Sequence, residues 1–587
     1  MADRRNPVLR ALLAGTFILG LTGAAIAQTP GNVAREKTLV VAHQTEAPNY
    51  RNVGMANPYS INNEDIRGSI LNMFEPLFYY NSNKDEIIPW LAESFDFNGD
   101  FTQATVKLRD GVTWSDGQPF TAKDVAFTYE MLRENGGGAK DLVQAGNVAA
   151  AVARTEAIDP LTVVFTLKAP DPRFALSFLM NYYDIGYQIV PEHIWSGVEN
   201  KAEFSNFDLA QGWPVTTGPW KLVRFTDSQI FMDRRDDYWG AAAGFTDLPA
   251  MERILTVPGG TRDRMAQMIG SGQVDITADL QLTSVMKELA ARPDVTTFSG
   301  KEAPYGSIDW WPTSLYFNHL NPKWGDARLR HAVNYFIDRD QLIEVVYGGA
   351  SEKLFGPFPA FGALKPYTDV TRTLAEANGI GVFDPAKGDA LMQEAGFTKN
   401  ASGMWEKDGT VLAAQIETIP QLDPVAPVVA EQLRRAGIDA QFRSSPESRA
   451  VMRDGRADLM IFGHRGSISD PYATLAMYTC ANALPEGQPT MFMARWCNEE
   501  YDAAVAKVAA LPPGDPGLAD GVSAAMEIWM REAVEVPLTE WYHRVPLNTA
   551  YWGNWPSLEN PYMQPAFWYT SGQFGYVLHQ LEPAAAQ

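Results

Sequence analysis

The sequence predicts an α/β protein whose open sheets are divided between two lobes. The main evidence is a unit that occurs twice, in residues 264–277 and 449–462: an apolar-faced helix, a glycine and a short apolar strand. Two further helices, in residues 384–396 and 423–437, start at Asp-Pro and end at Gly, which are preferred helix boundaries. Helices that alternate with short strands are typical of open α/β sheets. Because the repeated units lie about 180 residues apart, we expect two similarly built lobes.

The first 27 residues have the order of a secretory signal peptide. Basic residues precede an uncharged apolar run, which ends in Ala-Ile-Ala. We therefore expect cleavage after Ala27 and an exported protein. The run of about 17 residues ends at small residues, which favours a signal peptide over a membrane anchor. Arg4 and Arg5 leave a twin-arginine route open beside the general secretory route.

Composition limits the partners of the chain. Its 587 residues include 48 basic and 70 acidic side chains, a net charge of −22. A nucleic-acid partner would require a basic surface, so we expect none. After residue 27, no uncharged apolar run reaches the roughly 18 to 20 residues that span a bilayer. We expect a monomer without cofactor or metal.

The elements between residues 38 and 136 follow in a defined order. Residues 38–42 form a short buried strand, and a loop follows it. Phe95 and Phe97 alternate with polar residues, and residues 105–108 resume this pattern. The sequence therefore predicts a β-hairpin with a tight turn at Asn98-Gly99, where both residues would take positive φ. After two Asp-Gly turns, a capping box at residues 121–124 starts a helix that ends at Asn135.

Catalytic motifs are missing at the spacing that their chemistry needs. The sequence contains no nucleophile elbow, zinc-binding His pair, phosphate-binding loop or dinucleotide motif. Asp110 and Asp116 are the one carboxylate pair that would suit a glycosidase. Each precedes Gly, however, and Asp is favoured in such turns because its side chain hydrogen-bonds nearby backbone. We therefore expect no enzyme, with a secreted glycoside hydrolase as the rival hypothesis.

Cys480 and Cys497 are the only two cysteines. In an oxidising compartment they favour one disulfide that closes a loop rich in Pro and Gly, worth about 3 kcal/mol. Two buried free thiols are the alternative.

The first candidate for a ligand loop is GHRGSISDP, residues 463–471. Open α/β sheets bind ligands beyond the carboxyl ends of their strands, and the apolar run 459–462 leads directly into this polar loop. An ordinary connection between strand and helix is the alternative. Trp310 and Trp311 are adjacent, so an extended segment cannot turn both toward one core, and we expect at least one to meet a cleft or another element.

Several motifs together resemble the family 5 extracellular solute-binding proteins, the peptide, nickel and opine type that feeds ABC importers. They are LAESFDFNGDFTQATVKLRDGVTWSDGQPFTAKDVAFTYEML (91–132) and the segments 216–225, 272–276, 326–349, 389–397 and 495–505. The resemblance implies a two-lobed periplasmic-binding-protein fold, type II-like and of cluster C, with an inserted subdomain in the first lobe. It also implies ligand capture by lobe closure and delivery to the transmembrane permease subunits of an importer.

The resemblance also implies limits for each part of the chain. These are 1–27 for the signal peptide, 37–75 and 196–305 for the first lobe, 76–195 for the inserted subdomain, 306–540 for the second lobe, and 541–587 for a C-terminal return to the first lobe.

The ligand pattern of the family matches only in part. Peptide-binding members hold the ligand's α-amine with an Asp four residues before the Pro of an Asp-Pro or Glu-Pro pair. Here the pair is Asp470-Pro471 and that position is Ser467, so a buried ammonium would lose a partner worth about 2 kcal/mol or more. Residues 554–568 resemble the tail of the oligosaccharide-binding branch. We expect an oligosaccharide, with an oligopeptide or dipeptide as the alternative and a chaperone-like binder of unfolded chains as a third.

The candidate ligand contacts would stack on sugar rings through their aromatic rings and recognise hydroxyl groups through their polar atoms. They are Asn57, Tyr59, Trp310, Trp311, His464, Arg465, Ser467, Asp470 and Trp541.

Overall fold

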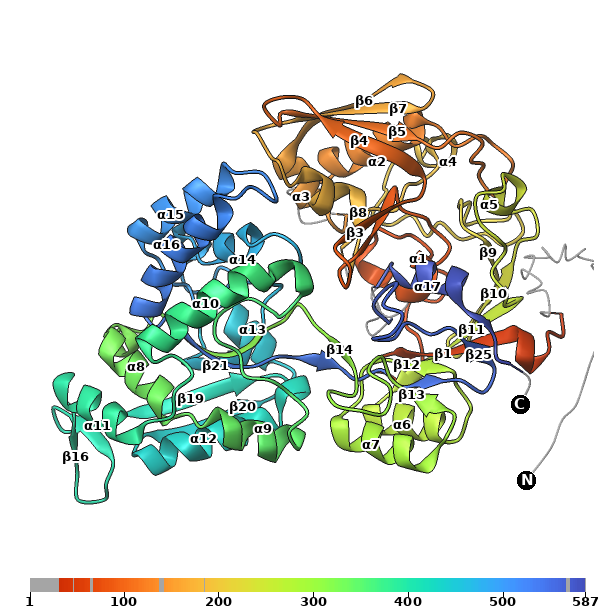
Figure 1. The fold of residues 1–587 in the computed structure, drawn as a ribbon. Helices are drawn as coiled ribbons and strands as arrows, with labels where there is room; N and C mark the ends of the chain where they lie inside the picture. The colour runs from red at the N-terminus through yellow and green to blue at the C-terminus, as the bar shows by residue number, and fades with distance from the viewer. Residues whose placement is uncertain are drawn as a thin grey trace, which may run out of the picture.

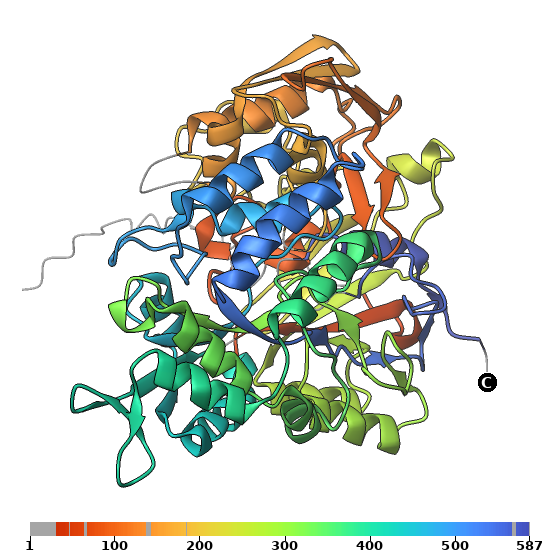
Figure 2. The same cartoon turned by 60° about the vertical axis from the view of Figure 1, so that its left-hand side comes forward.

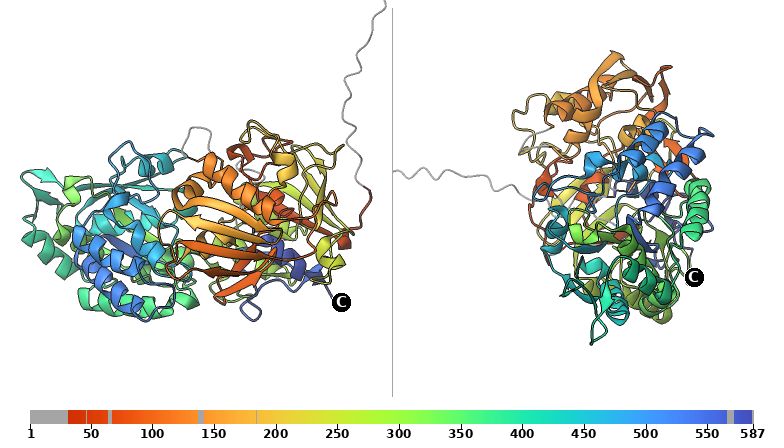
Figure 3. Two further views of the ribbon diagram at one scale, coloured as in Figure 1. Left: turned by 90° about the horizontal axis from the view of Figure 1, so that it is seen from above. Right: turned by 90° about the vertical axis from the view of Figure 1, so that its left-hand side faces the viewer.

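The computed structural model describes residues 31–45, 47–63, 67–136, 142–183, 185–565 and 571–585. They form two lobes, and the first lobe carries an inserted subdomain (Figure 1). The second lobe contains the green-to-blue elements at the left of that view. Seen from above, the two lobes lie side by side along the long axis of the molecule (Figure 3).

A seven-stranded sheet forms the centre of the first lobe. In spatial order its strands are β13 (Val295–Thr296), β24 (Leu547–Asn548), β12 (Ile276–Thr277), β1 (Thr38–Gln44), β11 (Arg253–Gly260), β10 (Ile230–Arg234) and β9 (Trp220–Phe225). Because β1 is parallel to both β11 and β12, the carboxyl ends of these three strands meet at one edge. Helices α6 (Arg262–Gly270) and α7 (Leu282–Ala291) share an apolar cluster with β1.

The inserted subdomain is built on an antiparallel four-stranded sheet. Its strands, in spatial order, are β4 (Ala92–Phe97), β5 (Gln103–Leu108), β7 (Thr162–Leu167) and β6 (Val152–Asp159). Helix α2 (Ala122–Glu134) packs on this sheet beside α3 (Ala145–Ala151). The predicted capping box is confirmed, since Thr121 and Asp124 exchange side-chain and backbone bonds at the start of α2.

The predicted hairpin is present, but its predicted turn is wrong. Strands β4 and β5 pair in antiparallel register, yet the positive φ falls on Phe101 (57°) and on neither Asn98 nor Gly99. The Asn98 side-chain oxygen accepts from the backbone N–H groups of Thr102 and Gln103 at 2.9 Å. Asn side chains stabilise longer loops in this way, so the loop extends beyond two residues.

The second lobe contains a mixed five-stranded sheet. In spatial order its strands are β20 (Asp439–Ser444), β19 (Ala413–Thr418), β21 (Leu459–Phe462), β15 (Thr313–Phe317) and β22 (Glu535–Thr539). The helices of this lobe are α8 (Ala327–Phe336), α9 (Arg339–Tyr347), α10 (Lys365–Asn378), α11 (Pro385–Glu394), α12 (Val425–Ala436), α13 (Ser448–Arg453), α14 (Tyr472–Met477), α15 (Glu499–Ala509) and α16 (Leu518–Arg531). Figure 1 shows α10, α14 and α16 above the sheet, and α9 and α12 below it.

The repeated helix-Gly-strand unit is confirmed in both lobes. In the first lobe, α6 is followed by Gly272 at φ +73° and by β12. In the second lobe, α13 is followed by Gly455 at φ +77° and by β21. Glycine takes this conformation without the steric cost of a Cβ atom, which explains its place between each helix and its strand.

Several short elements complete the lobes. They are α1 (Arg67–Leu71), β3 (Glu86–Pro89), β2 (Phe78–Asn81), β8 (Met180–Asn181), α4 (Glu192–Trp195), α5 (Trp239–Ala242), β25 (Trp552–Gly553), α17 (Phe574–Gln580) and β26 (Glu582–Pro583) in the first lobe, and β16 (Thr398–Lys399), β17 (Trp405–Lys407) and β18 (Thr410–Val411) in the second.

The chain crosses between the lobes in two adjacent strands. β14 (Ser307–Ile308) enters the second lobe and β23 (Tyr542–His543) returns from it, and the two pair in antiparallel register. Two short paired segments are a suitable hinge, because few backbone bonds must change when the lobes move.

Cys480 and Cys497 form a disulfide in the second lobe. Arg495 fills the loop between them, where its guanidinium donates to the carbonyl oxygens of Leu484 and Met493. Within the ranges described above, none of the helices combines the length and the apolar character needed to cross a membrane.

Candidate ligand-binding cleft

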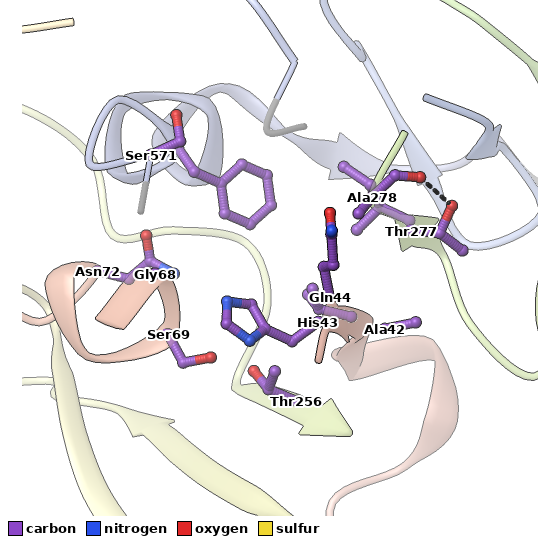
Figure 4. A pocket seen from close by; sticks show the side chains of 13 residues that line it. Ala42, His43, Gln44, Gly68, Ser69, Asn72, Thr256, Thr277, Ala278 and Ser571 are labelled. Carbon is purple, nitrogen blue, oxygen red and sulfur yellow. Dashed lines mark hydrogen bonds between the residues drawn. The ribbon is translucent and has the colours of Figure 1, made fainter. Parts of the chain in front are cut away.

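A small pocket lies at the edge of the first lobe where the parallel strands end (Figure 4). Its walls come from the ends of β1 and β12, from Thr256 within β11, from residues 68–72 of α1 and the turn after it, and from residues 571–574 near the C-terminus. The pocket has a volume of about 40 Å³. That is room for a few water molecules, and every residue that lines the pocket belongs to the first lobe.

Uncharged polar side chains line the pocket together with apolar ones. Gln44, Ser69, Asn72 and Ser571 each have a buried side-chain oxygen that finds no hydrogen-bond partner among the described residues. Figure 4 shows these side chains, with His43, arranged around one space. No carboxylate, Lys or Arg belongs to the described residues that line it. Buried polar groups normally have partners, so these oxygens are suited to hydroxyl or amide groups of a neutral ligand.

Strand β21 of the second lobe leads directly into the predicted ligand loop, residues 463–471. His464 is buried, and its Nε2 lies 3.0 Å from the Tyr478 hydroxyl. Burial lowers the pKa of His464 to about 4, so the ring is neutral at physiological pH. Arg465 is the exposed member of the loop, and its guanidinium lies 5.8 Å from the Trp310 ring.

Ser467 and Thr474 bond to each other's backbone. The Thr474 hydroxyl accepts from the Ser467 backbone N–H at 2.7 Å, and the Ser467 hydroxyl accepts from the Thr474 backbone N–H at 3.0 Å. Both side chains are buried. Ser467 therefore fixes the loop to the start of α14, and its hydroxyl is only partly available to a ligand.

Asp470 is buried in an ion pair that spans the two lobes. Its carboxylate accepts from Nε and Nη2 of Arg173, in the inserted subdomain, at 2.6 and 3.1 Å. The side chains are 8% and 6% exposed. The only carboxylate of the loop is therefore already neutralised from within the chain.

Trp310 lies where the lobes meet. Its ring stacks on Tyr183 of the inserted subdomain, with centroids 5.0 Å apart and planes 9° from parallel. Trp311 packs instead on Trp541 and Phe462 of the second lobe, with centroids 6.1 and 5.0 Å away. The two adjacent Trp rings thus face different surroundings, as the sequence predicted.

The structure gives Asn57 and Tyr59 positions inside the first lobe and outside the pocket. Asn57 Nδ2 donates to the backbone oxygens of Lys201 and Phe204 at 2.8 and 2.9 Å. The Tyr59 hydroxyl donates to the Gln188 carbonyl at 2.6 Å. Both side chains are at most 1% exposed. These bonds hold a loop to the lobe, and ligand contact by Asn57 and Tyr59 stays a prediction.

Sequence reasoning missed the neutral pocket and Arg173. Gln44 and Thr277 could have been found, because they stand at the ends of apolar strands, where open sheets bind ligands. Ser571 and Arg173 carried no comparable signal, since only the fold brings them to the cleft. Asp110 and Asp116, by contrast, behave as turn residues, accepting from the backbone N–H of Gly111 and Gln118.

Among the described residues, no group of three or more His, Cys, Asp or Glu side chains is placed to hold a metal ion. The cleft offers uncharged polar atoms and aromatic rings, together with the Arg173–Asp470 ion pair and the exposed Arg465.

Comparison with known proteins gives a consistent family. The family model for bacterial extracellular solute-binding proteins, family 5 (middle), matches residues 86–484. A putative ABC transporter peptide-binding protein of Brucella ovis is 27% identical over 334 residues, which is 56% of this chain and 56% of the relative. This chain thus spans little more than half of that relative's length. The nickel-binding periplasmic protein of Escherichia coli is 24% identical over 444 residues, covering 72% of this chain and 76% of that protein.

A solved structure shows the same fold. The periplasmic oligopeptide-binding protein of an oligopeptide ABC transporter from Thermotoga maritima superimposes with a TM-score of 0.79 at 22% identity, over 94% of this chain and 99% of that chain. A second structure of that protein, with mannohexaose bound, gives a TM-score of 0.75. The family model covers more than half of the chain, so the predicted resemblance is confirmed: the protein belongs to the family 5 bacterial extracellular solute-binding proteins.

Proposed function

We propose that this protein is the periplasmic solute-binding component of an ABC importer and that it captures an oligosaccharide between its lobes. The observation that carries the ligand class is the uncharged pocket formed by Gln44, Ser69, Asn72 and Ser571, with its buried oxygens that lack partners among the described residues. Sugar hydroxyl groups can donate to such oxygens without bringing a charge into the cleft.

The second lobe adds a further argument against a peptide with a free amine. An ammonium ion that enters a desolvated cleft needs a carboxylate partner. The family position for that carboxylate is Ser467, and the nearby Asp470 is paired with Arg173. A peptide amine would have to displace a guanidinium that already makes two charge-assisted bonds. An oligopeptide or dipeptide therefore remains the second candidate.

The Thermotoga maritima structure with mannohexaose shows that this fold accommodates an oligosaccharide. Stacking on aromatic rings and hydrogen bonds to hydroxyl groups would be the recognition chemistry here, with Trp310 and Tyr183 as one ring pair where the lobes meet. Closure of the lobes would then present the loaded protein to the permease.

The proposal predicts that oligosaccharides raise the melting temperature of the purified protein. A ligand at 100 times its dissociation constant stabilises the folded state by about 2.7 kcal/mol. The measurement is a thermal-shift panel of defined oligosaccharides, including mannohexaose. Peptides of about two to nine residues, similar in size to the oligosaccharides, are measured beside them. A shift with peptides alone would assign the ligand to the peptide class.

The pocket itself is tested by Ser69→Ala. The Ser69 hydroxyl is buried and has no partner among the described residues, so its removal is expected to leave the free protein equally stable or slightly more stable. The same change should weaken binding of the best oligosaccharide by about fivefold to tenfold, the cost of one hydrogen bond of about 1 to 1.5 kcal/mol.

The matched control is Ser228→Ala, which removes a hydroxyl from an exposed turn of the same lobe. It should change neither property. Calorimetric titration of both variants gives the dissociation constants, and equal affinities for Ser69→Ala and wild type would exclude this pocket from the binding site.

A further inference from the structure

Arg173 extends from the inserted subdomain into the second lobe. It lies between β7 and the helical turn Ala175–Leu179. Its neighbour Phe174 is fully buried and packs on Phe165 and Phe178, with centroids 5.3 and 4.9 Å away. The backbone at Arg173 is therefore anchored in its own subdomain, while its guanidinium contacts the other lobe.

The second lobe surrounds this guanidinium on several sides. Asp470 accepts from Nε and Nη2, the carbonyl of Ala509 accepts from Nη1 at 3.2 Å, and that of Val508 accepts from Nη2 at 3.4 Å. The ring of Tyr472 lies 4.7 Å from the guanidinium carbon. All four residues belong to the second lobe, and we call them the guanidinium socket.

The socket matches a guanidinium better than any other cation. The carboxylate receives two parallel N–H groups, which a planar fork supplies and an ammonium does not. Val508 and Ala509 end helix α15, where the last carbonyl groups carry the partial negative charge of the helix dipole. The aromatic face of Tyr472 adds a cation–π contact. Tyr472 also donates its backbone N–H to Asp470 at 2.9 Å, which fixes the carboxylate in the socket.

The contact exists only while the lobes are together. Figure 2 shows the helices of the second lobe in front of the inserted subdomain. Ile468, next to the socket, belongs to the apolar cluster of the first lobe. Separation of the lobes would return both buried charges to water, so the pair contributes selectively to the closed form.

We propose that the second lobe carries a guanidinium-binding site that Arg173 fills whenever the lobes close. Arg173 is then a positioning residue that holds the closed, ligand-retaining form from a place outside the ligand pocket. This inference rests on the lobe closure of the proposed function, and it is independent of whether the ligand is a sugar or a peptide.

Distance measurement by electron spin resonance tests the proposal without any ligand. Nitroxide labels on Ile158→Cys, in the inserted subdomain, and Val345→Cys, in the second lobe, would report lobe separation, since these positions are 61% and 64% exposed. The two native cysteines form the disulfide and do not react. Arg173→Gln is expected to raise the ratio of open to closed molecules by about tenfold or more.

Asp470→Asn should open the lobes in the same way. The double variant should be no more open than either single variant, because all three variants lack the same contact between Arg173 and Asp470. The charge-matched control is Arg154→Gln, whose side chain is 63% exposed on the same subdomain. It should keep the wild-type distances. Circular dichroism melting of each variant shows whether it is folded at the temperature of the measurement.

Methylguanidinium chloride provides a second measurement on the unaltered protein. It should compete with Arg173 and increase the open population of wild type, whereas tetramethylammonium chloride at the same concentration should not. Asp470→Asn should not respond. Unchanged distances in folded Arg173→Gln, or equal responses to both salts, would overturn the proposal. Neither result depends on the ligand class, so failure of the oligosaccharide proposal is seen separately.

Discussion

The Glu535→Gln protein is expected to be more stable than wild type above pH 8, by up to about 5 kcal/mol, and about equally stable near pH 4.5. Glu535 starts β22 and is fully buried. The Tyr478 hydroxyl donates to its Oε2 at 2.7 Å, and Oε1 has no partner among the described residues. Gln keeps the shape of the side chain and removes the charge that ionisation would bury.

The direction of this stability change with pH follows from the pKa of Glu535. Burial raises it from 4.5 to about 8, and the hydrogen bond from Tyr478 offsets only part of that shift. An acid whose pKa is higher in the folded state stabilises the fold fully below the unfolded value. That stability is lost as the pH rises through the folded value. Wild type should therefore lose stability between about pH 4.5 and 8 at this site.

Urea unfolding from pH 4.5 to 9 measures the effect. Glu134→Gln is the control, since that side chain is 65% exposed at the end of α2, and its stability should follow wild type at every pH. A constant difference between Glu535→Gln and wild type across this range would show that Glu535 does not titrate as inferred.

His543→Gln is expected to destabilise the protein by about 3 to 5 kcal/mol at pH 7, the usual cost of breaking a buried ion pair. His543 lies on β23 at the crossing between the lobes, where its Nε2 is 2.5 Å from Asp309 and its Nδ1 is 3.8 Å from Asp279. Burial alone lowers the pKa of His543, but the two carboxylates outweigh it and raise the pKa to about 9. Gln would remove the imidazolium charge from between Asp309 and Asp279.

The raised pKa of His543 also determines in which direction stability changes with pH. A histidine whose pKa is raised stabilises the fold fully below the unfolded value of 6.5, and this contribution is lost as the pH rises through 9. The difference between wild type and His543→Gln should therefore shrink between pH 7 and 10. His193→Gln, at a half-exposed surface pair with Asp116, serves as the control. A difference that stays the same up to pH 10 would contradict a protonated His543.

Local patterns predicted much of the fold. Gly272 and Gly455 mark the change from helix to strand in the two lobes, because the same backbone conformation is needed in both places. The capping box at Thr121 is equally local. The turn at Asn98-Gly99 failed because side-chain bonds from Asn98 to Thr102 and Gln103 competed with the expected two-residue turn.

The candidate site was predictable only in part. The loop 463–471 lies at the meeting of the lobes, and Trp310 and Trp311 do face different surroundings. The partners of that loop were beyond sequence reasoning, since Arg173 is 297 residues from Asp470 in the chain. Neutral side chains such as Ser69 and Ser571 are common on any surface. Only the fold shows that their oxygens are buried together.

The lobes are expected to close around a neutral, hydroxyl-rich ligand. Small-angle X-ray scattering of the wild-type protein measures this closure, with and without saturating mannohexaose or another oligosaccharide that raises its melting temperature. We expect the oligosaccharide to lower the radius of gyration and peptides of similar length to leave it unchanged. A protein that becomes more compact with peptides, and with none of the oligosaccharides, would show that its ligand is a peptide.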